Sequence, residues 1–260
     1  GIGRNALMSN TTANYNTAVG AASLDANTTG FGNTASGYAA LGANTSANYN
    51  AAFGAYASNA NTTGAANTAS GYKALYSNTT GVSNTATGAW SLGTNTTGCL
   101  NTASGYTSLF KNTTGCGGTA FGYKALCCNT TGLRNTGVGL CALIVSTTGS
   151  DNAAFGNRAL RSNTTAGQNT AIGAYALDLN TTGHSNVAVG TVTLGGNTTG
   201  IENTASGRYA MRCNSTASYN TAFGACSLFA NTTGARSTAV GFKALAATTT
   251  GSFNTALGYI

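Results

Sequence analysis

Residues 67–83 read NTASGYKALYSNTTGVS, and this unit repeats along the whole chain with a period of 17 residues and no insertion or deletion. With Asn67 taken as position 1, position 5 is glycine in every repeat, and position 9 is leucine in 13 of 15 repeats. The two exceptions at position 9 are Ser58 and Met211. So strict a period indicates that every repeat occupies an equivalent structural environment.

The composition of the repeat favours strands and turns. It is rich in threonine, glycine and asparagine and lacks the apolar stripe of a helix. Seventeen residues are too few for a helix pair but enough to wind once around a thin parallel β-coil. We therefore predict an all-β fold, a parallel β-solenoid (β-helix or β-roll) of about fifteen 17-residue coils, as a single continuous repeat array over residues 1–260.

Individual positions of the repeat predict specific contacts. Leucine at position 9 and alanine at positions 3 and 8 are expected to form a dry interior, with coils about 4.8 Å apart. Glycine at position 5 indicates a positive φ or a backbone contact too close for a Cβ atom. Position 15 is glycine in most repeats but alanine in four, so a positive φ is not required there. Asparagine at position 1 predicts a ladder of side-chain amides.

Positions 4 and 6 differ in side-chain size from repeat to repeat, so that a small residue at one accompanies a large residue at the other. Ser70 accompanies Tyr72, whereas Phe53 accompanies Ala55. Residues two apart share one face of a strand, so we interpret the exchange as steric compensation on one packed surface. That surface meets either the far wall of its own coil or another chain, and the pattern is compatible with both.

The composition excludes several classes of protein. The chain has 37 glycines, no proline and 6% charged residues, and it lacks the Gly-X-Y period of collagen. A hydrophobic content of 42% argues against a disordered chain. No apolar run approaches the length of a membrane-spanning helix, so we expect no membrane insertion. The net charge is +7, but the basic residues are scattered, so nucleic-acid binding is not expected.

Position 12 opens an N-x-S/T sequon in 13 of 15 repeats. In a secreted turn such a sequon accepts an N-linked glycan, so we predict glycosylation along one edge of the solenoid. The alternative is an asparagine–threonine ladder that matches the sequon by chance, since the threonines persist where the asparagine is lost. The candidate glycosylation sites are Asn10, Asn27, Asn44, Asn61, Asn78, Asn95, Asn112, Asn129, Asn163, Asn180, Asn197, Asn214 and Asn231.

The seven cysteines suggest disulfide bonds between coils, which would indicate an oxidising compartment. Two pairs share one offset, from position 11 of one coil to position 7 of the next, and a third pair stacks at position 16. Small buried thiols are the alternative interpretation. The predicted pairs are Cys128–Cys141, Cys213–Cys226 and Cys99–Cys116.

We expect no catalytic, cofactor-binding or metal site. The four acidic residues form two columns, Asp25 with Asp178 and Asp151 with Glu202. Their expected separations, about 43 Å and about 14 Å, exceed the roughly 5–9.5 Å that paired carboxylates need in glycoside hydrolysis. His184, one coil from Glu202, predicts a surface ion pair rather than a catalytic group, and a single histidine does not suit a zinc site.

The N-T-A-x-G-x-x-A-L…N-T-T-G pattern, which covers residues 1–260, resembles repeats of phage-tail-fibre-like and bacterial surface fibre proteins. More loosely, it is similar to the S-V-A-I-G-x-x-S repeats of trimeric autotransporter adhesin heads, which are β-rolls with a shorter repeat. The resemblance implies a fibre or stalk on a surface, with adhesion as a further possibility, and no catalysis.

Together these observations predict a non-enzymatic structural repeat shaft of an extracellular fibre or filament, on a cell or virion surface, glycosylated at one sequon per coil. We expect self-association, end to end or as a parallel homo-oligomer. An adhesin or phage-type receptor-binding fibre is the alternative. Ice binding is a third hypothesis, because threonine columns recur at positions 2, 13 and 14, although positions 13 and 14 are neighbours in sequence. Both ends of the chain fall within a repeat, as in a segment of a longer array or in coils that stack to extend a fibre.

Overall fold

The computed structural model describes all 260 residues, in two compact units that we call unit 1 (Gly1–Thr131) and unit 2 (Gly132–Ile260). Each coil contributes one three-residue strand at positions 2–4. The strands of unit 1 are β1 (Thr17–Val19), β2 (Thr34–Ser36), β3 (Ala51–Phe53), β4 (Thr68–Ser70), β5 (Thr85–Thr87), β6 (Thr102–Ser104) and β7 (Thr119–Phe121). Those of unit 2 are β8 (Thr136–Val138), β9 (Ala153–Phe155), β10 (Thr170–Ile172), β11 (Val187–Val189), β12 (Thr204–Ser206), β13 (Thr221–Phe223), β14 (Thr238–Val240) and β15 (Thr255–Leu257).

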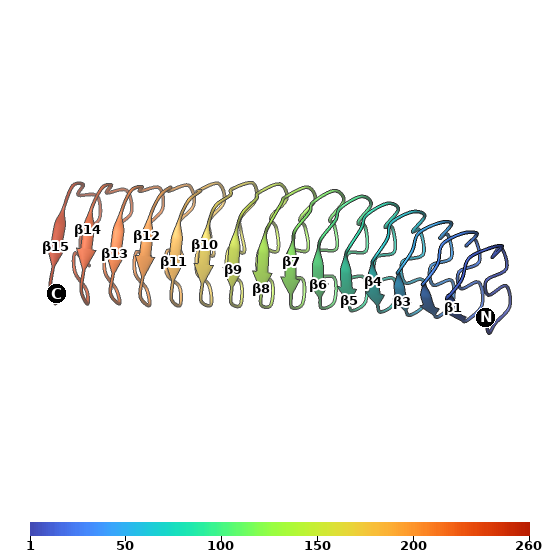
Figure 1. Ribbon diagram of the computed structural model, residues 1–260. Helices are drawn as coiled ribbons and strands as arrows, with labels where there is room; N and C mark the ends of the chain where they lie inside the picture. Colours follow the sequence, from blue (N-terminus) through green and yellow to red (C-terminus); the bar gives the residue numbers. More distant parts are fainter. The chain divides into compact units, whose positions relative to one another are not determined.

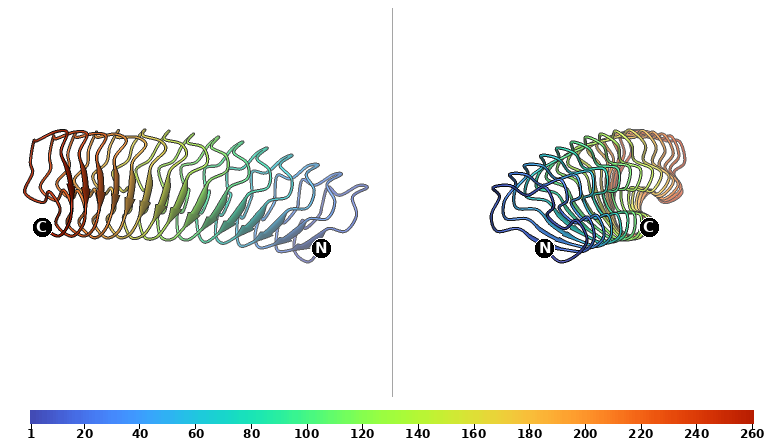
Figure 2. Two further views of the ribbon diagram at one scale, coloured as in Figure 1. Left: turned by 60° about the vertical axis from the view of Figure 1, so that its left-hand side comes forward. Right: turned by 90° about the vertical axis from the view of Figure 1, so that its right-hand side faces the viewer.

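Within each unit, neighbouring strands are parallel and are shifted by one repeat. Thr17 pairs with Thr34 in unit 1, and Ala171 pairs with Ala188 in unit 2. Figures 1 and 2 show the strands of each unit side by side in chain order, each followed by a loop that returns to the next strand. Backbone hydrogen bonds join these loops too, for example from the position 13 amide to the position 13 carbonyl of the next coil. Each unit is therefore a parallel β-solenoid with one coil per repeat, which confirms the predicted fold class. No helix is long and apolar enough to span a membrane.

The apolar interior is the one that the sequence predicts. The leucines of position 9 are fully buried from Leu24 to Leu228, and so are the alanines of position 3 from Ala35 to Ala239. Burying a leucine side chain contributes about 1.5–3 kcal/mol relative to leaving it exposed. Because each coil adds the same buried column members, the stability of the solenoid accumulates coil by coil.

Two asparagine ladders complete the interior. At position 1, Asn84 Nδ2 donates to Asn67 Oδ1 at 3.1 Å and to the carbonyl of position 15 at 2.8 Å. At position 12, Asn78 Nδ2 donates to Asn61 Oδ1 at 2.9 Å and to the carbonyl of position 15 at 3.0 Å. All four side chains are buried, and these bonds satisfy their polar groups. The ladder predicted at position 1 is confirmed, and position 12 forms a second one.

Position 5 requires glycine for both of the predicted reasons. The φ of Gly105 is +133°, and a Cβ atom there would lie 2.5 Å from the carbonyl oxygen of Gly122, one coil away. A residue with a side chain rarely adopts this conformation. The glycines of position 15, such as Gly98, have no positive φ, in agreement with the alanines that occur there.

Left-handed backbone also occurs at positions 7, 9 and 17, where most residues are not glycine. The φ of Trp90 at position 7 is 59°, that of Leu109 at position 9 is 48°, and that of Arg236 at position 17 is 55°. Such a conformation costs roughly 1–2 kcal/mol for a residue with a Cβ atom. The repeated turns that it creates aim the position 9 leucines inward. Nothing in the residue types at these positions predicted this geometry.

Candidate functional site

The outer face of the strands carries an apolar stripe, which we call the strand stripe and define as the exposed apolar side chains of positions 4 and 6. Phe53 is 46% exposed and Tyr72 48% in unit 1, and Phe223 is 45% exposed in unit 2. The surface of steric compensation therefore does not pack against the far wall of its own coil. The strand stripe comprises Ile2, Val19, Tyr38, Phe53, Tyr72, Tyr106, Phe121 and Tyr123 in unit 1, and Leu140, Phe155, Ile172, Val189, Phe223, Phe242, Leu257 and Tyr259 in unit 2.

Positions 6 to 11, which follow the invariant glycine and which we call the turn segment, hold most of the charge. Nine of the eleven basic residues lie there with only two acidic ones, Asp25 and Asp178. The remaining two basic and two acidic residues cancel, so the whole net charge of +7 belongs to the turn segments. The basic residues are Arg4, Lys73, Lys111 and Lys124 in unit 1, and Arg158, Arg161, Arg208, Arg212 and Lys243 in unit 2.

In unit 1 the turn segments gather aromatic rings around one lysine. Lys73 Nζ lies 4.6 Å from the ring centroid of Trp90 and 5.0 Å from that of Tyr76, with Tyr56 and Tyr72 within 5.7 Å. Desolvation raises the pKa of the Tyr56 hydroxyl, and the nearby Tyr38 raises it further. The rings pack edge to face, so they fill the space around the ammonium group themselves and stabilise it by cation–π contacts.

In unit 2 the turn segments hold arginines that stack on single rings. The guanidinium carbon of Arg158 lies 5.4 Å from the ring centroid of Tyr175. Those of Arg208 and Arg212 lie 4.5 Å and 5.7 Å from the ring centroid of Tyr209. Arg208 also lowers the pKa of the Tyr209 hydroxyl by hydrogen bonding to it. A guanidinium group that lies over a ring can still donate hydrogen bonds from its in-plane N–H groups.

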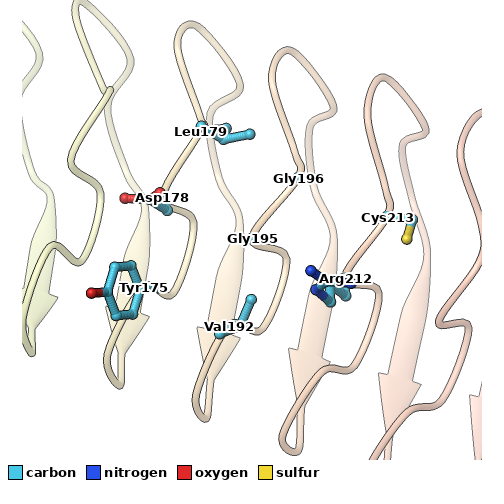
Figure 3. A pocket seen from close by; sticks show the side chains of 8 residues that line it. All are labelled: Tyr175, Asp178, Leu179, Val192, Gly195, Gly196, Arg212 and Cys213. Atoms are coloured by element: carbon cyan, nitrogen blue, oxygen red, sulfur yellow. The ribbon is translucent and has the colours of Figure 1, made fainter.

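Two hollows open among these residues of unit 2. One, of about 420 Å³, lies where Gly195 and Gly196 replace larger residues of positions 10 and 11; Figure 3 shows Asp178 on the preceding coil and Arg212 on the following one. The other hollow, of about 570 Å³, is lined by the apolar residues Leu140, Ile144 and Val145 together with Arg158 and Arg161. Both hollows therefore combine apolar walls with guanidinium groups.

The sequon asparagines lie inside the coil. The twelve from Asn27 to Asn231 are at most 2% exposed, and only Asn10, in the first coil, is half-buried. A glycan on a buried amide nitrogen would remove a hydrogen that the ladder uses and would need space that the interior lacks. The prediction of one glycan per coil is therefore incompatible with the folded coil at these twelve positions, and the alternative, a structural ladder, holds there.

All seven cysteines are free thiols in the structure, so none of the three predicted disulfides is present. Column stacking nevertheless brings Cys99 Sγ and Cys116 Sγ to 2.6 Å from one another. The neighbouring thiol raises the pKa of Cys99 by hydrogen bonding to it. Cys128, Cys141, Cys213 and Cys226 are half-buried without a disulfide partner.

Two of the four acidic residues form ion pairs with arginines. Asp151 accepts two hydrogen bonds from Arg134, at 2.6 Å and 2.9 Å, which lower the pKa of its carboxyl group. Asp178 forms an ion pair with Arg161, with Nε and Oδ1 2.9 Å apart. The expected ion pair of His184 with Glu202 is absent; the imidazole Nδ1 lies 3.2 Å from a serine hydroxyl instead. No cluster of side chains suited to hold a metal ion occurs.

The threonine columns of positions 13 and 14 differ in their environment. The position 13 hydroxyls donate along the solenoid, as from Thr79 Oγ1 to the carbonyl of Thr96 at 3.1 Å, whereas the position 14 side chains are exposed. One exposed column in this segment does not form the two-dimensional array that ice binding would need.

No family model, no curated protein and no solved structure matches this chain. The resemblance to surface-fibre repeats therefore stays a prediction. The residues that remain as functional candidates are those of the strand stripe and of the turn segments.

Proposed function

We propose that this chain is a non-enzymatic structural shaft of an extracellular fibre or filament, on a cell or virion surface, in which parallel copies associate through the strand stripe. The observation that supports this proposal is the exposure of large apolar side chains along the strands of both units. Monomeric soluble proteins rarely expose contiguous apolar patches of more than a few hundred Å².

The shape of the strand stripe also suits a second copy of the chain. In coils 33–49, 50–66 and 67–83 of unit 1, the large residue lies at position 6, then 4, then 6: Tyr38 follows Ser36, Phe53 precedes Ala55, and Tyr72 follows Ser70. Over these three coils the large side chain therefore changes from one column to the other between successive coils. Two copies with the same coil spacing can place the rings of one beside the small residues of the other.

Association in solution tests this proposal. We expect sedimentation velocity to show oligomers of the unaltered chain, and the fourfold variant Phe53→Ser, Phe121→Ser, Phe155→Ser, Phe223→Ser to sediment as a monomer. Serine is a natural residue at this position, as at Ser70, so the coil should keep its fold, which circular dichroism checks.

The matched control is the double variant Tyr49→Ser, Tyr219→Ser, which removes exposed rings from position 17, outside the strand stripe. It should associate like the unaltered chain. A monomeric unaltered chain, or equal association of the fourfold variant, would contradict lateral assembly. Electron micrographs of the oligomers would show end-to-end stacking if that mode operates instead.

An adhesin or receptor-binding fibre is the second candidate, and the basic turn segments favour it. Ice binding has weaker support, because position 14 alone is exposed among the neighbouring threonine columns. Thermal hysteresis of the purified chain would distinguish it from the other two.

A further inference from the structure

The turn segments of unit 2 place arginines at both hollows, with Arg158 and Arg161 lining one and Arg212 lining the other. Arg158 and Arg161 belong to coil 152–168, and Arg208 and Arg212 belong to coil 203–219, three coils further on. At about 4.8 Å per coil, the two groups are about 14 Å apart. We propose that this surface binds a linear acidic polysaccharide, whose carboxylate groups pair with Arg158, Arg208 and Arg212 and whose hydroxyl groups reach Asp178. This inference goes beyond a structural role and does not require that the chain assemble.

The three arginines are available and already oriented for an anion. The two ion pairs of unit 2 are Arg134–Asp151 and Arg161–Asp178, so Arg158, Arg208 and Arg212 have no carboxylate partner. Each stacks on a tyrosine ring, which restricts the side chain before any ligand arrives. A planar guanidinium held in this way donates two parallel hydrogen bonds to a carboxylate with less loss of conformational entropy.

Asp178 adds a feature that points to hydroxyl groups. It lines the hollow, and its side chain is only 17% exposed. Its Oδ1 is buried beside Nε of Arg161, at 2.9 Å, and its Oδ2 accepts one hydrogen bond from Nη2 of Arg161, at 3.2 Å, so Oδ2 can accept a further one. An ionised carboxylate can only accept, and a sugar hydroxyl can supply the donor. A ligand with both carboxylates for the arginines and hydroxyls for Asp178 is an acidic sugar chain.

The spacing of charge is less suited to a nucleic acid. A DNA duplex carries one negative charge per about 1.7 Å of axis, so a 14 Å stretch holds about eight phosphates against three unpaired arginines. Binding of single strands relies on aromatic rings that stack with bases. The rings of Tyr175 and Tyr209 already stack with arginines of the chain. A polymer with about one charge per sugar matches the observed spacing more closely.

The test is binding of the full chain to immobilised polygalacturonate, with neutral dextran and single-stranded oligothymidylate as comparison ligands. We expect binding to polygalacturonate that weakens as salt is added, and little binding to dextran. Arg208→Ala with Arg212→Ala should weaken binding at least about tenfold, because two charge-assisted hydrogen-bond groups are lost. Arg158→Lys keeps the charge but loses the paired donors, so it should weaken binding by a smaller factor.

The matched control is Arg236→Ala. Arg236 also stacks on a ring, that of Tyr219 at 5.2 Å, and has no carboxylate partner, but it lies at position 17, outside the turn segment. Its removal should leave binding nearly unchanged. Melting curves of the arginine variants should match that of the unaltered chain, because these arginine side chains lie outside the interior. Equal loss of binding in Arg236→Ala and in the Arg208/Arg212 variant would overturn the proposal.

Asp178→Ala separates recognition of a sugar from simple attraction between charges. The variant makes the surface more positive, so a purely electrostatic surface would bind polygalacturonate more tightly. If Asp178 accepts a sugar hydroxyl, binding should weaken instead. Tighter binding of this variant would overturn the proposal, as would absent binding to polygalacturonate. Binding of oligothymidylate at least as tight as that of polygalacturonate would overturn it in favour of a nucleic acid.

Discussion

Within each coil, the interior positions and the solvent-facing positions of the turn segment show opposite patterns of variation. A leucine at position 9 contacts its counterparts in the adjacent coils, and an asparagine at position 12 donates to the asparagine of the preceding coil. The column at position 10, which lies only one residue from the leucines, contains aspartate, glycine, tyrosine and arginine in different coils. Interior side chains pack in columns with the same position of the adjacent coils, so their residue type is conserved from coil to coil. Side chains that face solvent do not have this constraint and can vary. The interior positions therefore carry the stability of the solenoid, and the turn segments and strand stripe are available for function.

The largest effect on stability is expected at position 5. Gly105→Ala combines a positive φ of 133° with a backbone contact to the next coil and should destabilise the chain by about 2–6 kcal/mol. The comparison is Gly98→Ala at position 15, whose Cβ would also lie 2.5 Å from a carbonyl oxygen of the next coil; it should destabilise the chain less, because φ is not positive there and four natural repeats have alanine. Thermal melting of both variants checks this prediction, and equal melting temperatures would contradict the different roles of the two glycine columns.

Substitutions in the leucine column should either lower or raise the stability of the chain, depending on the position. Leu109→Ala should cost about 2–5 kcal/mol, because the surrounding coils cannot close the resulting cavity. Ser58 occupies the same position, is buried, and has no hydrogen-bond partner for Oγ, so Ser58→Leu should raise stability by about 1–3 kcal/mol. Urea denaturation of both variants measures these changes. A destabilised Ser58→Leu chain would mean that the coils are not equivalent at this position.

A substitution in the asparagine ladder should lower the stability of the chain less than a substitution in the leucine column. Asn78→Ser removes the donor to Asn61 Oδ1 and the acceptor for Asn95 Nδ2, and leaving such buried polar groups unpaired costs about 1–3 kcal/mol. Thr80→Ser, at an exposed position of the same loop, is the control and should have almost no effect. Hydrogen exchange of the adjacent coils should show faster opening in the first variant only.

The smallest effect is expected at an exposed ion pair. Arg134 lowers the pKa of the Asp151 carboxyl group, so this pair stabilises the fold above the pKa of the unfolded chain, and the stabilisation is lost as the pH falls through the lower folded value. Asp151→Asn should therefore lower the melting temperature slightly at about pH 7 and leave it unchanged at about pH 2. Glu202→Gln, in the same column but without an ion pair, should have no effect at either pH. A larger loss of melting temperature at low pH than at about pH 7 would contradict the stabilising role of the Arg134–Asp151 ion pair.

The sequence predicts the repeating parts of the fold well. The period, the buried leucines, the first asparagine ladder and the glycines of position 5 could all be inferred because each coil repeats the same local environment. The sequons show where this reasoning fails. An N-x-S/T motif is compatible with an exposed glycan acceptor and with a buried asparagine ladder. The turns that bury Asn78 depend on residues with left-handed backbone angles, and no sequence motif identifies these residues.

The candidate sites were harder to predict than the fold. The basic residues are dispersed in sequence, and only the structure shows that Arg158 lines one hollow and Arg212 lines another. The same holds for the volume exchange of Phe53 and Tyr72, which indicates a shared face but not whether it is inside or outside.

The sequence by itself determined the coil, its length and its interior, since a constant period leaves stacking as the way to bury the same residues in every repeat. The tertiary structure decided the direction in which each remaining side chain points. That direction depends on the backbone angles of positions 5, 7, 9 and 17, which are held in place only by hydrogen bonds and contacts between coils.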